Sequence, residues 1–111
     1  MIQGLQRAAS KTKESLLKHY ERQLVYKIEY ARGVIKDFRK LPKEVKEKSL
    51  EIIENELAKD PYRGKPLTGP YKGLWKYRAG NYRIIYSIEK QSLVIFVLRI
   101  RHRKDVYEGI L

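Results

Sequence analysis

The sequence predicts an α+β domain in which a helical hairpin packs on one face of a four-stranded, mainly antiparallel sheet. Two strand-like runs, 74–79 and 82–88, flank the turn signal Gly80-Asn81 and together predict a β-hairpin. A continuous apolar run over 93–100 has the length and composition of a central strand. Helical spacing of apolar residues before these strands predicts the two helices that cover the sheet.

The segments before the hairpin follow in a regular order. Residues 1–24 form an N-terminal extension with a thin amphipathic helical pattern, and 25–111 form the main domain. A first strand is expected over 24–30, where side chains alternate in character. Two helices are expected over 31–41 and 43–59.

Two loops complete the pattern. Residues 61–73 hold three of the four prolines and three glycines, which predicts a rigid loop without regular structure. Residues 101–104 are predicted to form a basic loop after the last strand.

The predicted hairpin has two chemically different faces. If its loop is two residues long, alternation places Lys76, Arg78 and Arg83 on one face. Five aromatic or β-branched side chains then share the opposite face as a core, namely Trp75, Tyr77, Tyr82, Ile84 and Tyr86. A three-residue loop would change the parity of one strand and divide the basic set.

Composition narrows the class of protein. The chain has 111 residues, a net charge of +12 and no cysteine, so a disulfide framework and a thiolate metal site are excluded. The absence of a long apolar run and of a signal-peptide core leads us to expect a cytoplasmic protein. Residues 61–111 contain eleven Lys or Arg against three acids, which indicates a polyanion site in the C-terminal half.

The segment from Gly73 to Tyr107 carries a family resemblance. It reads G-L-W-K-Y-R-A-G-N-Y-R-I-I-Y, then an apolar strand, then R-I-R-H-R-K-D-V-Y. This pattern resembles the RelE/ParE toxin superfamily, and the resemblance runs from about Val25 to the C-terminus. It implies a type II toxin of the RelE kind, an endoribonuclease (mRNA interferase) that cleaves messenger RNA in the ribosomal A site and is held inactive by an acidic, RelB-like antitoxin. The residues at the family's functional positions are Lys76, Arg83, Arg101 and Tyr107.

The chemistry implied is cleavage without a metal or other cofactor, in which the RNA 2′-hydroxyl attacks the adjacent phosphate. Lys76 is the candidate proton acceptor, because neighbouring positive charge disfavours its protonated form. Arg83 and Arg101 can stabilise the pentavalent phosphate, and Tyr107 can stack on the RNA or take part in proton transfer. Further RNA contacts are expected from Arg78, Lys65, Lys72, His102, Arg103 and Lys104, with Arg63 on the approach to the site.

The identity of the proton donor stays open. Arginine is a poor donor because it is charged at any ordinary pH, whereas the imidazole of His102 could supply the acid. Leu74 occupies the position where some members of the family have a second lysine, so proton acceptance could rest on Lys76 alone.

Other readings of the basic residues remain open. Arg78 could pair with Glu29, and Arg99 could be a solubility charge on an edge strand. Strict alternation along 93–100 would place Arg101 on the face away from Arg83. Two alternative functions follow: a ParE-type toxin that inhibits DNA gyrase by binding, and a catalytically degenerate toxin homologue that acts in transcriptional autoregulation.

Overall fold

The structure is a computed structural model that describes residues 25–105. The helix expected within 1–24 and the candidate Tyr107 lie outside the described residues. None of the described helices is long and apolar enough to cross a membrane.

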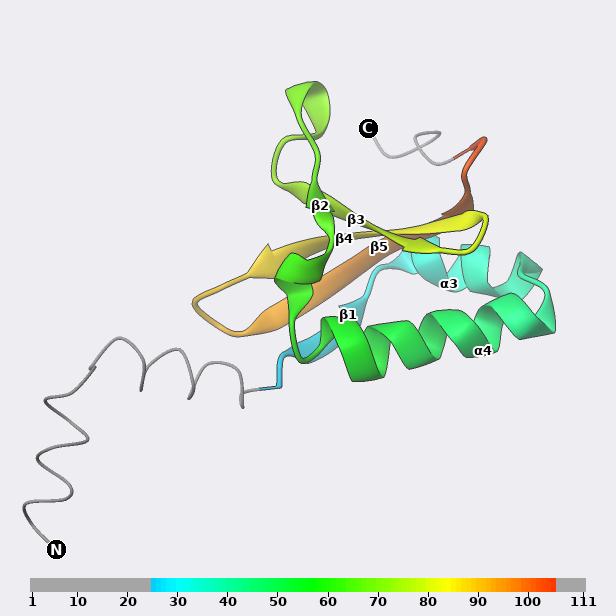
Figure 1. The fold of residues 1–111 in the computed structure, drawn as a ribbon, viewed down its shortest axis with the longest axis horizontal. Helices are drawn as coiled ribbons and strands as arrows, with labels where there is room; N and C mark the ends of the chain where they lie inside the picture. Colours follow the sequence, from blue (N-terminus) through cyan, green and yellow to red (C-terminus); the bar gives the residue numbers. More distant parts are fainter. Residues whose placement is uncertain (1–24, 106–111) are drawn as a thin grey trace, which may run out of the picture.

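The described chain forms a five-stranded mixed sheet with both helices on one side (Figure 1). The strand order is β1-β5-β4-β3-β2, with β1 parallel to β5 and the remaining neighbours antiparallel. The elements are β1 (Lys27–Tyr30), α3 (Arg32–Lys40), α4 (Lys43–Glu51), β2 (Lys65–Pro66), β3 (Leu74–Ala79), β4 (Tyr82–Glu89) and β5 (Val94–His102).

The α+β class and the helical hairpin are confirmed, but the prediction of four strands was wrong. The fifth strand, β2, comes from the loop that was expected to lack regular structure, and its two residues pair with β3. The same loop contains two 3-10 turns, η2 (Pro61–Arg63) and η3 (Gly69–Tyr71). Backbone pairing with an existing strand edge requires no hydrophobic pattern, so the sequence alone gave no signal for β2.

Pro42 separates the two helices as expected, since it stands at the N-cap of α4. The second helix continues beyond Glu51 as a π-helix, η1 (Ile52–Leu57), which ends near the predicted end of the helix. Ile52, Ile53 and Leu57 are buried there against the inner face of the sheet. Burial of these side chains against the strands supplies most of the stability that an isolated helix of this length lacks.

The β3–β4 hairpin has the predicted two-residue loop and register. Ala79 pairs with Tyr82, and Arg78 pairs with Arg83. Gly80 has a φ of 63°, a conformation that glycine adopts without steric cost in a tight hairpin turn. Ile84 and Tyr86 are fully buried on the face covered by the helices, so the predicted core face is confirmed.

A β-bulge in β5 changes the side-chain parity of the strand after Leu98. Tyr86 of β4 pairs with Val97, and the residue before it, Ile85, pairs with Arg99, so Leu98 is an extra residue in β5. Beyond the bulge, Arg101 pairs directly with Arg83 instead of facing away from it. The strand also runs to His102, so the expectation that 101–104 form a loop was wrong for its first two residues. A single inserted residue has no signature in the alternating pattern of an apolar run.

Gly64 lets the 61–73 loop lie directly on the sheet. The buried hydroxyl of Tyr86 donates a hydrogen bond of 2.6 Å to the carbonyl oxygen of Pro61. Burial raises the pKa of Tyr86 well above its ordinary value, so this hydroxyl stays protonated and continues to donate. A Cβ atom on Gly64 would contact the Tyr86 hydroxyl and would lie 2.6 Å from the carbonyl oxygen of Lys76.

Substituting Gly64→Ala should therefore destabilise the domain by about 1–3 kcal/mol, the usual cost of overpacking a close contact. Urea unfolding of the variant and the wild type measures this difference. In a Tyr86→Phe background, which loses the hydrogen bond to Pro61 but also one of the two clashing groups, Gly64→Ala should cost less than it does in the wild type. Unchanged stability of Gly64→Ala would show that the loop does not pack closely on the sheet in solution.

Candidate nucleic-acid interface

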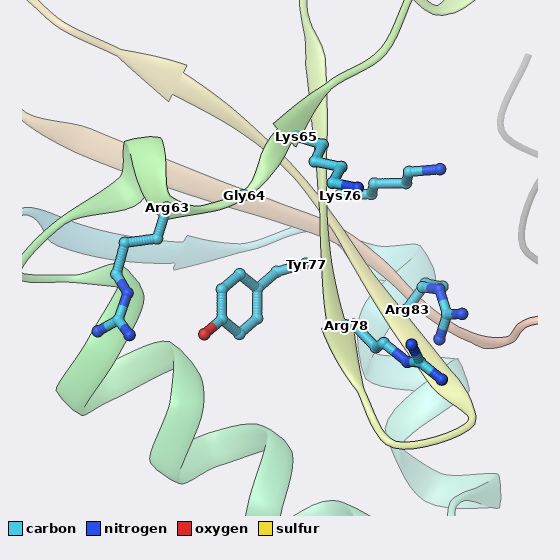
Figure 2. A pocket seen from close by; sticks show the side chains of 7 residues that line it. All are labelled: Arg63, Gly64, Lys65, Lys76, Tyr77, Arg78 and Arg83. Carbon is cyan, nitrogen blue, oxygen red and sulfur yellow. The ribbon is translucent and has the colours of Figure 1, made fainter.

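A cavity of about 360 Å³ follows the free edge of β3 on the described part of the chain (Figure 2). It is lined by Arg63, Gly64, Lys65, Lys76, Tyr77, Arg78 and Arg83, and we call it the basic groove. The edge is open because β2 pairs only with Trp75 and Lys76 and ends before the rest of β3. Five of the seven lining residues are cationic and none is acidic, so the groove favours an anionic ligand.

Figure 2 shows how the side chains divide around β3. Lys76, Arg78 and Arg83 lie on one side of the strand, and Tyr77 and Arg63 lie on the other. This arrangement confirms the predicted basic face of the hairpin. Lys76 and Arg78 lie opposite Tyr77 because successive side chains of a strand point to opposite sides of the sheet.

Like charges face one another across neighbouring strands on this basic side. Lys65 pairs with Lys76, Arg78 pairs with Arg83, and Arg83 also pairs with Arg101. Like charges directly opposite one another destabilise a sheet. A bound polyanion would offset this repulsion, whereas a purely structural sheet gains nothing from it.

The turn of the hairpin orients two of these cations. Arg78 donates through Nε to the carbonyl oxygen of Gly80 at 3.4 Å, and Arg83 donates through Nη1 to the same oxygen at 3.1 Å. Arg83 also donates to the carbonyl oxygen of Tyr82 at 3.0 Å. Within residues 25–105 neither guanidinium forms a salt bridge, so the alternative pairing of Arg78 with Glu29 is absent. Their remaining N–H groups can donate to phosphate oxygens.

Tyr77 and Arg63 are held by Glu56 at the far wall of the groove. The Tyr77 hydroxyl donates to Glu56 at 3.1 Å, and the guanidinium of Arg63 lies 3.6 Å from the same carboxylate. Burial, followed by the hydrogen bond and the charge of Glu56, raises the pKa of Tyr77. Tyr77 therefore remains a neutral part of the wall.

Arg101 is separated from the basic groove although its backbone is the neighbour of Arg83. Its Nε donates to Asp37 of α3 at 3.2 Å, so its guanidinium turns toward the outer edge of β5. Its Nη1 donates more weakly to the carbonyl oxygen of Asp105, at 3.4 Å. The structure thus brings together Lys76 and Arg83 of the predicted catalytic set, whereas the guanidinium of Arg101 lies in a different cavity.

Asp37 is the centre of a buried ionic cluster that the sequence analysis missed. It is 8% exposed and accepts two hydrogen bonds of 2.8 Å from Arg99 and one of 3.1 Å from the backbone N–H of Ile100. Burial by itself raises the pKa of Asp37, but these hydrogen bonds and the charges of Arg99 and Arg101 hold it below its ordinary value. Arg99 is therefore an ion-pair residue and not an edge-strand solubility charge. The sequence does contain one indication that Asp37 is buried, because Asp37 lies on the same helical stripe as the buried Val34 and Leu41.

The other predicted RNA contacts are dispersed. Lys65 lines the basic groove, whereas Lys72 is exposed after η3 and does not line it. His102 lies opposite Tyr82 on the helix-covered side, with the two rings edge to face at 5.3 Å. The Nδ1 of His102 accepts a hydrogen bond from the backbone N–H of Lys104, and Arg103 and Lys104 are exposed in the turn after β5. In the part of the chain that the structure describes, no group of three or more acidic, histidine or cysteine side chains is placed to hold a metal.

Comparison with known proteins identifies the family. A family model described as the ParE toxin of the type II toxin–antitoxin system, parDE, matches residues 28–107. Toxin RelG of Mycobacterium tuberculosis H37Rv is 31% identical over 83 residues, which cover 74% of this chain and 95% of the relative. The mRNA interferase toxin RelE of Escherichia coli K12 is 30% identical over 91 residues, covering 76% and 92%. The chain therefore belongs to the RelE/ParE superfamily of type II toxin–antitoxin toxins.

Solved structures agree with this assignment. The toxin–antitoxin complex RelBE2 of Mycobacterium tuberculosis contains a chain that matches with a TM-score of 0.68 and 30% identity, covering 71% of this chain and 99% of that one. The RelE–RelB complex of the archaeon Pyrococcus horikoshii matches with a TM-score of 0.56 and 30% identity, covering 71% and 96%.

The Asp37 cluster predicts a specific dependence of stability on pH. Asp37→Asn should cost about 2–4 kcal/mol at pH 7, because it leaves the partly buried Arg99 without its counter-charge. The folded pKa of Asp37 lies below its unfolded value of about 3.9, so its stabilisation is complete above that pH. The stabilisation is lost as the pH falls through the folded pKa, and the gap between variant and wild type should then shrink.

Urea unfolding at pH 7, 5, 3 and 2 measures this gap. The exposed Asp60 provides a control, because Asp60→Asn removes a carboxylate charge at the surface while the amide oxygen can still accept the hydrogen bond from the backbone N–H of Tyr62. A gap for Asp37→Asn that stays constant down to pH 2 would show that the carboxylate charge is not what stabilises the cluster.

Proposed function

We propose that this toxin is a ribosome-dependent endoribonuclease that cleaves messenger RNA in the A site. The observation that carries the proposal is the row of like-charged pairs on the outer side of the sheet, which is the side away from the two helices. Lys76 and Arg83 of this row line one open groove. A relative of about 30% identity is named an mRNA interferase toxin, which supports the same activity here.

The proposed reaction needs no cofactor. The 2′-hydroxyl of the RNA gives its proton to Lys76 in its neutral form and attacks the adjacent phosphorus. The bond to the 5′-oxygen then breaks, which leaves a 2′,3′-cyclic phosphate, and the departing oxygen takes up a proton. Arg83 can stabilise the pentavalent phosphate through its remaining N–H groups, because a guanidinium donates to two oxygens at once. Arg101 and Tyr107 belong to the proposed set through the family resemblance, as a second cation and as a stacking or proton-transfer residue. The guanidinium of Arg101 would have to turn from Asp37 toward the basic groove to reach the same phosphate.

The departure at Leu74 has a structural explanation. Leu74 packs with the buried Leu67 and Ile85 in a small apolar cluster on the outer side of the sheet. That cluster holds the 61–73 loop in place, so the side chain serves packing where some relatives have a second lysine. The proposed proton acceptor is therefore Lys76 alone.

An acidic antitoxin of the RelB kind is the proposed partner, since solved relatives are complexes of RelE with RelB. A second observation supports a protein partner. An apolar cavity of about 390 Å³ between α3 and the rest of the domain is lined by residues that include Tyr30, Ile35 and Phe38. Tyr30 and Ile35 are 40% and 48% exposed, as expected of side chains that a partner covers.

The matched family model is named for ParE toxins, so gyrase inhibition of the ParE type remains a second candidate function. That function requires binding but no proton acceptor. The two functions therefore differ in their dependence on Lys76.

Single substitutions in the basic groove test the nuclease. Arg83→Ala should reduce A-site cleavage by at least about 100-fold, the usual effect of removing one group that stabilises a charged transition state. Toe-printing of translating ribosomes measures cleavage, with Lys76→Ala as the second variant and the exposed Lys48→Ala of α4 as the charge-matched control. All variants should retain the thermal stability of the wild type, because none of the three side chains is buried.

Cleavage that persists in both groove variants would remove the groove from the mechanism. Growth arrest without cleavage by the wild type, together with loss of DNA supercoiling by gyrase, would favour the ParE-type alternative instead.

A further inference from the structure

A second cavity lies at the free outer edge of β5, against α3. The parallel pairing of β1 with β5 ends at Tyr30 and Val97, so β5 has no strand on its outer side from Leu98 to His102. The cavity has a volume of about 410 Å³. Its charged lining residues are Lys36, Asp37, Lys40, Arg99, Arg101 and Asp105.

The charge of this cavity favours an anion. Four of its six charged residues are cations, and the more deeply buried of its two acids, Asp37, has no acceptor capacity to spare. The two Asp37 oxygens already accept four hydrogen bonds, from Arg99, Arg101 and the Ile100 amide. A ligand therefore meets two exposed lysines, Lys36 and Lys40, the exposed carboxylate of Asp105, and the buried carboxylate of Asp37, whose charge is compensated. The four cations outnumber the two acids, so the cavity keeps a net positive charge.

Lys36 and Lys40 stand four residues apart on α3, so both side chains leave the same face of the helix. Arg101 lies between them and the basic groove. Its Nε is anchored on Asp37, which limits the rotation of the guanidinium, while its Nη2 has no hydrogen bond within the described residues. Its Cα is the cross-strand partner of Arg83, so one lining residue of each cavity lies a single strand spacing, about 5 Å, from the other along the sheet.

We propose that this cavity is a second phosphate-binding site for the RNA, in which Lys36 and Lys40 contact backbone phosphates beside the one bound in the basic groove. Asp37 is its positioning residue, since it fixes Arg101 between the two sites. This proposal rests on the proposed function in one respect, that the ligand is RNA. With the second site, the RNA would run from the edge of β3, across the ends of β4 and β5, to α3.

The salt dependence of binding tests the site. The probe is a fluorescein-labelled single-stranded RNA 12-mer with 2′-O-methyl groups, which the toxin cannot cleave because no 2′-hydroxyl is free. Each phosphate contact with single-stranded nucleic acid contributes about 0.7 to the slope of log K against log salt concentration. The double variant Lys36→Ala/Lys40→Ala of the full chain should therefore lower this slope by about 1.4 and weaken binding severalfold at 100 mM KCl.

A charge-matched control distinguishes the loss of a specific phosphate-binding site from a general loss of positive charge. Lys48 and Lys90 are exposed, line neither cavity, and lie on α4 and in the β4–β5 turn. Lys48→Ala/Lys90→Ala loses the same two charges and should change the slope by less than half as much. Thermal melting should show all four side chains to be dispensable for folding.

The outcomes are distinct from those that test the nuclease. Equal slope changes in both double variants, or no RNA binding by the wild type, would overturn the second site. Unchanged RNA binding together with weaker binding of an acidic antitoxin peptide would assign the lysines to a protein partner and would also overturn it. RNA binding with the predicted slope change but no cleavage by the wild type would uphold the site and reject the nuclease.

Discussion

The repulsion between like charges on the outer side of the sheet is the constraint that the rest of the domain accommodates. Three cross-strand pairs, Lys65–Lys76, Arg78–Arg83 and Arg83–Arg101, are cationic on both sides. Each such pair costs a fraction of a kcal/mol, up to about 1 kcal/mol. The opposite side of the same strands compensates, because the fully buried Ile84 and Tyr86 pack under the two helices and contribute several kcal/mol.

Asp37 decides how much of this positive charge is neutralised inside the chain. Its single negative charge is shared between Arg99 and Arg101, and it also accepts a hydrogen bond from the Ile100 N–H, which β1 leaves without a strand partner. Lys76, Arg78 and Arg83 have no such counter-charge among residues 25–105. These three uncompensated cations lie together at the hairpin, where an external anion can neutralise them.

The matches of this chain include a family model named for ParE toxins and a relative named an mRNA interferase toxin, so the fold alone does not determine the activity. In this chain the open groove contains a lysine beside two arginines, which suits phosphate chemistry. The apolar cavity next to α3 is chemically different from both basic cavities. An antitoxin and an RNA can thus use different parts of one small surface.

Local patterns in the sequence determined the hairpin and its two faces. Gly80-Asn81 predicted the turn, and for a loop of two residues, which the structure has, alternation placed Lys76 and Arg83 on one side and Tyr86 on the other. The position of Arg101 was decided only by the tertiary structure, because the bulge at Leu98 reversed the parity of β5. The Asp37 cluster and the pairing of β2 with β3 likewise join residues far apart in the chain. A periodic pattern indicates which side of an element is buried. It does not indicate which distant residue neutralises a charge or which distant segment pairs with the edge of a strand.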